Sequence, residues 1–419
     1  MRNIAALSLA TVAAAALLAG ALFLQYQNTS TAAVSRNDIV VTNFQQDHGF
    51  VLQSSAGTQR DDPRTYALGE QSLMLTTDGE GSAVFTRKAL TPALNFTDRA
   101  LKIWVKIDGV DNLGELRIST TGDDFRTWTD YWVAGARSEA GFLRDNEWNV
   151  VTISPGQAAV TGNPDSSRVD SVQVRVADRG TGQPLTVWLN SIAMVPKNDR
   201  AIVTFAFDDG YASDYSEARP VLDKYHFPAT SYVVGALVGS SGRLSVEQLK
   251  SLQDLNGWDI ASHSYTHSNL TQRVGSEIED DLVLSKQFLE RNGLYRGSMH
   301  FAYPHGGFDN AELRSLVQKY FDTARIAEGG SETLPPSDPY RLRVFMVVNT
   351  TTPAQVSSEV QSAIEGGDWL ILVFHRLVNA NADQEMEYPK SDFEQIVDDV
   401  ASRGLEVLTV SEVHENKFR

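Results

Sequence analysis

From Ala201 onward, strand-like segments alternate with amphipathic helical segments, and this alternation limits the fold more than any other feature of the sequence. Short apolar segments such as AIVTFAF and DWLILVF are separated by helical patterns such as SVEQLKSLQDL. Strands that are joined through helices run parallel to one another. Repeated over roughly 220 residues, the pattern predicts a parallel sheet that closes, or nearly closes, into a distorted (β/α) barrel.

Two of the expected helices carry recognisable start signals. Ser276 is followed three residues later by Glu279, and Ser391 by Glu394, so we expect a capping box at each position. Gly293 is expected to end the first of these helices, because glycine adopts the left-handed conformation that helix ends favour.

The chain before the barrel has a different character. Residues 38–197 contain short alternating runs, among them GELRIST and VDSVQVRVAD, separated by Gly, Asp and Asn. Alternation with a period of two predicts an all-β sandwich or jelly roll built from antiparallel strands. We therefore expect this domain at 38–197 and the barrel at 198–419.

Aromatic side chains in DDFRTWTDYWV suggest a carbohydrate-binding role for the predicted sandwich. Trp128, Tyr131 and Trp132 could form a platform for sugar rings, although aromatic residues in β proteins more often belong to the core. The prediction is a carbohydrate-binding-like domain; a simple spacer is the alternative.

The N-terminal region, residues 1–37, is expected to direct export. Residues 4–24 contain no charged side chain, a length that suits an uncleaved membrane anchor. Their alanine content and the absence of a following basic segment are typical of a signal peptide instead. In either case we expect the rest of the chain outside the cytoplasm, either secreted or periplasmic, or tethered to the membrane through this segment.

Composition excludes several classes of function. The chain has 36 Lys and Arg against 53 Asp and Glu, a formal charge of −17, and no basic cluster, which argues against nucleic-acid binding. It has no cysteine, which excludes disulfides, thiolate metal sites and a cysteine nucleophile.

Polar side chains follow several of the predicted barrel strands. Asp208 and Asp209 end AIVTFAF, and His263 and His267 follow WDIAS. Active sites of such barrels lie where strands end, so these groups should meet. One carboxylate and two imidazoles offer three ligands and leave positions open, which suits catalytic zinc. The same ligands also serve non-haem iron, so they do not identify the reaction. His375 ends another apolar strand.

The order of these motifs resembles a known family. FDDG, HSYTH, FAYPHG and LVFH resemble motifs one, two, three and five of the NodB-homology polysaccharide deacetylases, carbohydrate esterase family four. The resemblance covers residues of about 200 to 415. It implies a divalent metal, most commonly Zn²⁺, held by Asp209, His263 and His267. It also implies that Asp208 is the general base for the attacking water and that His375 protonates the departing amine.

The third motif has a separate implied role and departs from the family pattern. A backbone N–H near Tyr303, Pro304 and His305 would stabilise the oxyanion. The family usually has an arginine two residues before this proline, paired with the base, but here Ala302 stands there. We predict that Arg343 supplies the missing partner of Asp208, with Arg341 as the alternative. The fourth motif, which orients the catalytic histidine, is not evident.

The resemblance implies a hydrolase that removes N-acetyl groups from an extracellular or cell-envelope polysaccharide and releases acetate. Other readings remain open at this point. The barrel could be a degenerate, non-catalytic glycan-binding or scaffold module, or the enzyme could cleave O-acetyl esters on a glycan or a non-sugar amide. Oligomeric state is not predicted.

Overall fold

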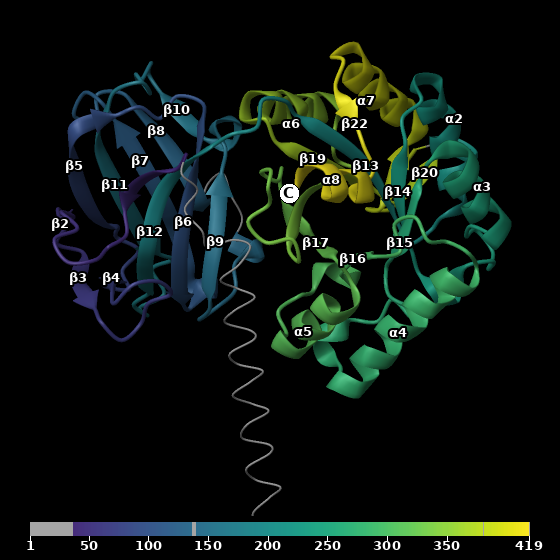
Figure 1. The fold of residues 1–419 in the computed structure, drawn as a ribbon, viewed down its shortest axis with the longest axis horizontal. Coiled ribbons are helices and arrows are strands. Elements are labelled where there is room, and N and C mark those ends of the chain that lie inside the picture. Colours follow the sequence, from purple (N-terminus) through teal and green to yellow (C-terminus); the bar gives the residue numbers. More distant parts are fainter. Residues whose placement is uncertain (1–36, 136–139, 380, 419) are drawn as a thin grey trace, which may run out of the picture.

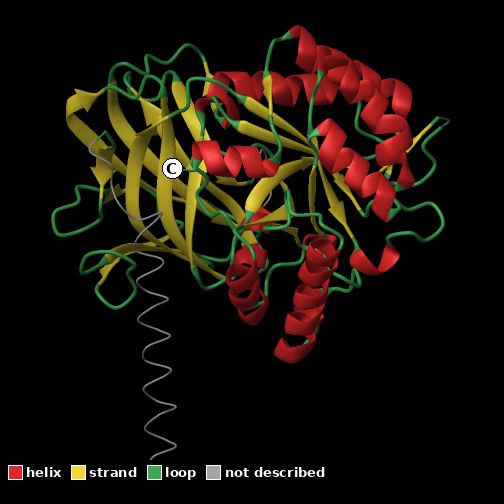
Figure 2. Cartoon of the chain, turned by 45° about the vertical axis from the view of Figure 1, so that its right-hand side comes forward, coloured by secondary structure: helices red, strands yellow, loops and turns green. Residues whose placement is uncertain are grey.

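The computed structural model describes residues 37–135, 140–379 and 381–418. They form an all-β unit followed by a (β/α) barrel, which confirms the predicted fold class (Figure 1). Figure 2 shows the separation of the two units by type, with strands filling one and helices surrounding the strands of the other. The predicted signal or anchor at 4–24 lies outside the described residues. Within them, no helix is long and apolar enough to cross a membrane.

The N-terminal unit, called the sandwich below, consists of two antiparallel sheets. The strands of the first sheet are β1 (Ile39–Thr42), β3 (Gly57–Asp62), β4 (Ser72–Thr77), β6 (Arg99–Asp108), β9 (Trp148–Ile153) and β12 (Thr186–Pro196). Those of the second are β2 (Val51–Leu52), β5 (Val84–Leu94), β7 (Leu113–Thr121), β8 (Trp128–Ala134), β10 (Ala159–Thr161) and β11 (Val169–Asp178). The first sheet runs β3-β4-β12-β6-β9 with β1 beside β12, and the second runs β10-β8-β7-β11-β5-β2.

Alternate residues of both sheets fill one shared core. Ile103 and Val105 of β6 and Val174 and Val176 of β11 are fully buried in the same apolar cluster. Because successive side chains of a strand point to opposite faces, the residues between them lie on the outer faces. This arrangement explains why apolar residues alternate with a period of two in the sequence of the sandwich.

The three aromatic residues proposed as a sugar platform do not share one face. Tyr131 is 5% exposed and belongs to the core, so its place in an exposed platform was predicted wrongly. Trp128 and Trp132 lie on the opposite face of β8 and are half-buried. The indole N–H of Trp128 donates to Asp130 (2.9 Å), and the guanidinium of Arg117 lies 5.0 Å from the ring centre of Trp132.

In the described residues, seven parallel strands close the barrel of the C-terminal unit. They are β13 (Ile202–Asp208), β14 (Ala229–Val233), β15 (Asp259–Ser262), β16 (His300–Ala302), β17 (Thr323–Gly329), β18 (Leu342–Met346) and β19 (Trp369–Phe374). They pair in chain order, and β13 closes the ring by pairing with both β14 and β19. β22 (Glu406–Val407) adds to β13 from outside the ring. The carboxyl ends of the strands therefore meet on one rim.

Helices cover the barrel, and a small parallel ribbon lies beside it. The helices are α2 (Arg219–Leu222), α3 (Val246–Asn256), α4 (Gly275–Arg291), α5 (Ala311–Tyr320), α6 (Pro353–Gly366), α7 (Lys390–Ser402) and α8 (Val410–Lys417). The ribbon pairs β20 (Arg376–Val378) with β21 (Glu387–Pro389).

Both predicted capping boxes are wrong. α4 and α7 begin before the serines that were expected to cap them, after Val274 and Pro389. Capping boxes do occur at other helices, where Ser245, Thr352 and Thr409 bond the backbone of a Gln or Glu three residues later. Gly293, with φ of +70°, lies just beyond the end of α4, as predicted.

Arg343 and Arg341 fasten the barrel to the sandwich. The guanidinium of Arg343 donates to Glu332 (Nη2 to Oε1, 2.7 Å) and to the carbonyl oxygen of Thr152 in β9 (3.1 Å). Arg341 donates to the carbonyl oxygen of Phe142 (2.6 Å) and to Asn149 (2.8 Å). All these groups are buried, so the two units are joined by polar contacts that water does not reach.

A second buried cluster extends the same interface. Asp368 accepts hydrogen bonds from Ser154 of the sandwich (2.6 Å) and from Ser331 of the barrel (2.9 Å). A Cβ atom at Gly156 would lie 1.9 Å from the carbonyl oxygen of Ser362 in α6, so only glycine permits this close approach. The sandwich is thus packed against the barrel, backbone to backbone.

We expect the substitution Arg343→Met to lower the free energy of unfolding by about 3–5 kcal/mol, because it leaves the carboxylate of Glu332 buried without its partner. Adding Glu332→Leu should recover part of the loss, since both charges are then removed. Urea denaturation of the single and double variants measures this. An unchanged midpoint for Arg343→Met would contradict the proposed clamp.

Asp368 should make stability depend on pH. Burial raises the pKa of Asp368 from its ordinary 3.8 to about 6, against the opposing effects of Ser154, Ser331 and Arg343. The folded state thus binds this proton more tightly than the unfolded chain. The resulting stabilisation is complete below about pH 4 and is lost as the pH rises through about 6, by about 3 kcal/mol in total.

Urea denaturation from pH 4 to pH 7 tests this expectation. The variant Asp368→Asn should show a smaller decline in stability over that range than the wild type. The exposed Asp108, substituted in the same way, is the control and should reproduce the wild-type curve. Parallel curves for wild type and Asp368→Asn would show that Asp368 is not the group responsible.

Candidate metal centre and active site

The end of β13 presents two carboxylates to the barrel rim. Asp208 is the last residue of the strand and is 3% exposed. Asp209 and Gly210 follow with φ of +69° and +64°, so the chain turns sharply where the strand ends. Asp209 in the left-handed region is uncommon for a residue with a side chain, and such strain is concentrated at functional sites.

The end of β15 supplies two imidazoles through a loop with the same kind of strain. His263 directly follows the strand, and Ser264 and His267 have φ of +64° and +60°. Asp281 of α4 holds this loop by accepting the backbone N–H groups of Tyr265 (2.6 Å) and Thr266 (3.1 Å). The position of His267 is therefore fixed by the helix behind it.

These two strand ends bring the predicted metal ligands together. One ligand atom from each of Asp209, His263 and His267 lies within 4.8 Å of the others. Nε2 of His267 is 3.2 Å and Nε2 of His263 is 3.8 Å from Oδ1 of Asp209. Nδ1 of His263 is 2.9 Å from the carbonyl oxygen of Ala302 and therefore donates to it, which leaves the lone pair of Nε2 directed at the cluster.

The protonation of the histidines also suits a metal ion. Burial lowers the pKa of His263 to about 4, although Asp208 acts in the opposite direction. Burial likewise lowers the pKa of His267. Neutral imidazole is the form that binds metals. The three residues therefore fit a divalent ion in both geometry and charge.

Asp208 is held by a buried arginine, which is Arg325 of β17. Nη2 of Arg325 donates to Oδ1 of Asp208, and its guanidinium lies 4.6 Å from the ring centre of Tyr232. Arg325 is 1% exposed. Burial would raise the pKa of Asp208, but Arg325, His263 and His375 outweigh it and lower the pKa to about 2. The carboxylate is therefore ionised at neutral pH.

The predicted partner of Asp208 was wrong. Arg343 binds Glu332 and the sandwich, and the alternative, Arg341, binds Phe142 and Asn149. The sequence analysis did not identify β17 as a strand, because its segment TARIAEG carries charged residues and ends in glycine. A short run with an arginine between apolar residues, directly after the helix α5, is the signal that would have identified it.

Arg243 is a second arginine at the site that was not predicted from the sequence. Its Nη1 donates to the backbone carbonyl of Asp209 (2.8 Å) and lies 3.7 Å from Oδ2 of the same residue. The guanidinium lies 3.8 Å from the ring centre of Tyr211. Arg243 thus supports the strained turn that orients the Asp209 carboxylate.

The loop after β16 gives only part of the predicted oxyanion site. The N–H of Tyr303 donates to the carbonyl oxygen of Arg325 (3.1 Å), and its hydroxyl donates to Tyr340 (3.2 Å), so Tyr303 is structural. Pro304 has no N–H to offer. This leaves the backbone N–H of His305, a residue with φ of +58°, as the candidate oxyanion donor among the three. Its ring centre lies 4.6 Å from that of His267.

His375 lies directly after β19 and faces Asp208. Its Nε2 is 3.8 Å from Oδ2 of Asp208. Within the described part of the chain, its Nδ1 has no hydrogen-bond partner. This agrees with the missing fourth motif, because no side chain here orients the ring through Nδ1.

Two curated proteins are similar to part of this chain. The putative polysaccharide deacetylase YxkH of Bacillus subtilis is 27% identical over 135 residues, which are 32% of this chain and 48% of that protein. The poly-beta-1,6-N-acetyl-D-glucosamine N-deacetylase of Staphylococcus epidermidis is 24% identical over 189 residues, 42% of this chain and 59% of that protein. The chain thus spans about half the length of these curated relatives.

Solved structures give weaker likenesses. The Xyl-CE4 domain of a multidomain xylanase from the hindgut metagenome of Trinervitermes trinervoides has 19% sequence identity and a TM-score of 0.38, and it covers 52% of this chain and 90% of that one.

The family comparison agrees with the motifs. Residues 196–322 match the model of the polysaccharide deacetylase family. The match includes both strand ends that carry Asp208, Asp209, His263 and His267, whereas Arg325 and His375 lie beyond it. Residues 196–322 of this chain are therefore similar to the polysaccharide deacetylases, the family that its motifs resemble.

Proposed function

We propose that the protein is a metal-dependent hydrolase that removes N-acetyl groups from an N-acetylglucosamine-containing polysaccharide. The convergence of Asp209, His263 and His267 beside the arginine-paired Asp208 is the observation that carries this proposal. The names of the relatives support it at the level of the substrate class, since one is an N-deacetylase of poly-β-1,6-N-acetylglucosamine.

In this proposal Asp209, His263 and His267 hold a divalent metal ion, most commonly Zn²⁺. The ion supplies Lewis acidity, which makes water a stronger acid and polarises a carbonyl oxygen. Asp208, which is not among the three clustered ligands, is free to accept a proton. Two neighbouring carboxylates thereby divide metal binding and base catalysis between them.

The remaining steps are assigned to residues on the same rim. Water adds to the carbonyl carbon of the N-acetyl group and gives its proton to Asp208. We assign to the N–H of His305 the stabilisation of the developing oxyanion. The bond from carbon to nitrogen then breaks, and His375, as the general acid, donates a proton to the departing nitrogen. The products are acetate and a free amino sugar.

Arg325 positions the base rather than touching the substrate. It is buried behind Asp208, between that carboxylate and the ring of Tyr232. The ion pair holds one oxygen of Asp208, so that the other, Oδ2, remains directed toward His263 and His375.

We also propose, from the apolar segment 4–24, that the protein acts outside the cytoplasm, secreted or membrane-anchored.

We expect Asp209→Ala and His263→Ala to weaken Zn²⁺ binding by at least tenfold, because each removes a ligand. Asp208→Asn should retain Zn²⁺ binding and lower the rate of acetate release by about 10²–10⁴, because it removes the general base. Calorimetric titration with Zn²⁺ and an acetate assay separate the two roles. Loss of metal from Asp208→Asn, with metal retained by Asp209→Ala, would reverse the assignment.

The acetate assay should include a panel of substrates. Release from polymers of N-acetylglucosamine, abolished by a chelator and restored by Zn²⁺, is the expected result. Release from acetylated xylan alone would indicate an esterase that acts on O-acetyl groups. Binding of glycans without any acetate release would indicate a non-catalytic module.

We expect Arg325→Met to slow acetate release by at least tenfold, with Arg325→Lys recovering part of the rate, because the base loses the charge that positions it. Stability should also fall by about 3–5 kcal/mol, since Asp208 is left buried and unpaired. Arg343→Met is the matched control, because it also breaks a buried ion pair but leaves Asp208 intact. An Arg325→Met enzyme with the wild-type rate would contradict the positioning role.

A further inference from the structure

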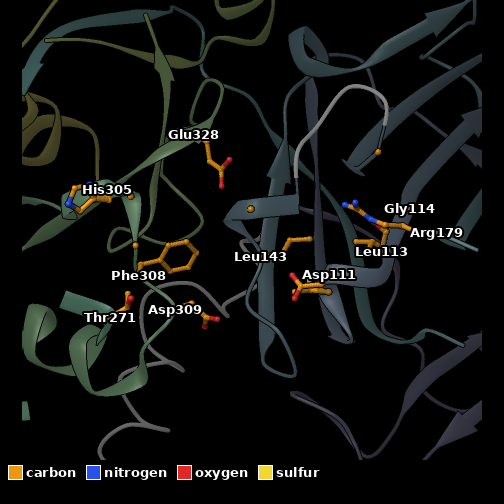
Figure 3. Close-up of a pocket in the computed structure, with 15 residues that line it drawn as sticks. Asp111, Leu113, Gly114, Leu143, Arg179, Thr271, His305, Phe308, Asp309 and Glu328 are labelled. Atoms are coloured by element: carbon orange, nitrogen blue, oxygen red, sulfur yellow. The ribbon is translucent and has the colours of Figure 1, made fainter. Parts of the chain in front are cut away.

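The sandwich and the barrel enclose a cleft of about 1120 Å³ beside the candidate active site. Its barrel wall includes His305, Asp309 and Glu328, and its sandwich wall includes Asp111 and Arg179. Figure 3 shows the two sets of side chains on opposite sides of the cleft. Pockets for drug-sized ligands measure about 300–1,000 Å³, so this cleft has room for several sugar rings.

The cleft is continuous with the rim that carries the metal ligands. His305 lines the cleft, and its ring also contacts that of His267, with centres 4.6 Å apart. Nε2 of His305 is 3.3 Å from the backbone oxygen of His267. A chain molecule whose reacting group lies at the metal ligands can therefore extend along the loop after β16 into the cleft.

The sandwich wall is held in place by the barrel itself. Phe142 precedes the cleft residue Leu143, and its carbonyl oxygen accepts a buried hydrogen bond from Arg341 of the barrel (2.6 Å). Two other residues of the sandwich wall are bonded to each other. Nε of Arg179 donates to the carbonyl oxygen of Leu113 (3.2 Å), and this bond orients the guanidinium of Arg179. The buried contacts of Arg343 and Asp368 also join the two walls, through Thr152 and Ser154 of the sandwich.

The lining suits a neutral, hydroxyl-rich ligand. Carboxylates at Asp111, Asp309 and Glu328 accept hydrogen bonds, while Arg179 donates them. Gly114, Gly306 and Gly307 add stretches of wall without side chains, where a ligand can approach the backbone. The apolar lining residues Leu113, Leu143 and Phe308 are buried, so the surface is not one that an apolar partner would cover.

We propose that this cleft binds the sugar units that adjoin the reacting unit, so that the sandwich is one wall of the polysaccharide site and not a separate binding module. The inference rests on the proposed function for the identity of the chain that enters the cleft. Asp111 and Arg179 are assigned as the sandwich residues that bind sugar hydroxyl groups.

Calorimetry with oligomers of β-1,6-linked N-acetylglucosamine tests the proposal on the full-length protein. If the cleft binds the adjoining units, a pentamer gains contacts there that a dimer at the rim lacks, so the pentamer should bind at least tenfold more tightly. Asp111→Ala and Arg179→Ala should each remove most of this gain. Arg87→Ala is the matched control, because Arg87 forms an exposed ion pair with Asp124 (3.2 Å) away from the cleft and should retain the gain.

The outcomes separate this inference from the proposed function. Equal affinity for dimer and pentamer, no binding of either, or an unchanged gain in both cleft variants would overturn the role of the cleft. Tighter pentamer binding that depends on Asp111 and Arg179 supports the inference even if no acetate is released. Tighter pentamer binding without acetate release would refute the proposed deacetylase activity but not the role of the cleft.

Discussion

Closure of the barrel is the constraint on which the site depends. β13 pairs with β14 on one side and β19 on the other, so the first and last strands of the ring become neighbours. Asp208 and His375, which are far apart in the sequence, thereby come within 3.8 Å of each other. Because all the ring strands are parallel, their carboxyl ends share one rim, and the residues that follow them converge there. Left-handed turns at Asp209 and His267 then direct the ligands inward.

Two buried ion pairs of the same kind serve different purposes in this protein. Arg325 and Asp208 lie at the open rim, where the second oxygen of the carboxylate remains available for chemistry. Arg343 and Glu332 lie at the interface, where Nη2 of the arginine also donates to the backbone carbonyl of Thr152. Burial makes each pair costly to break. What differs is the surroundings: one pair faces a cluster of imidazoles and the other faces the sandwich.

This difference explains why the arginine prediction failed, although the three predicted ligands lie together in the structure. Asp209 follows one apolar strand, and His263 and His267 follow another. Because the ends of parallel strands share one edge, these positions predict that the three side chains meet. The partner of Asp208 comes from a strand on another side of the ring, and its choice depends on which arginine points inward. Arg325 and Arg343 lie in adjacent strands, β17 and β18, and both are buried. Sequence patterns do not distinguish a side chain inside the ring from one directed at a neighbouring unit.

The sequence by itself determined the two kinds of architecture, the alternation of strands and helices in the barrel apart from β17, and the strand ends that carry Asp208, Asp209, His263, His267 and His375. These follow from local periodicity, because the spacing of apolar residues sets the type of element and a polar residue is costly to bury without a partner. Only the tertiary structure decided that Arg325 holds Asp208, that Tyr303 is structural, and that the sandwich forms a wall beside the rim. Each of these depends on which distant residues meet after the chain folds, and that is set by packing between elements rather than by the pattern within any one of them.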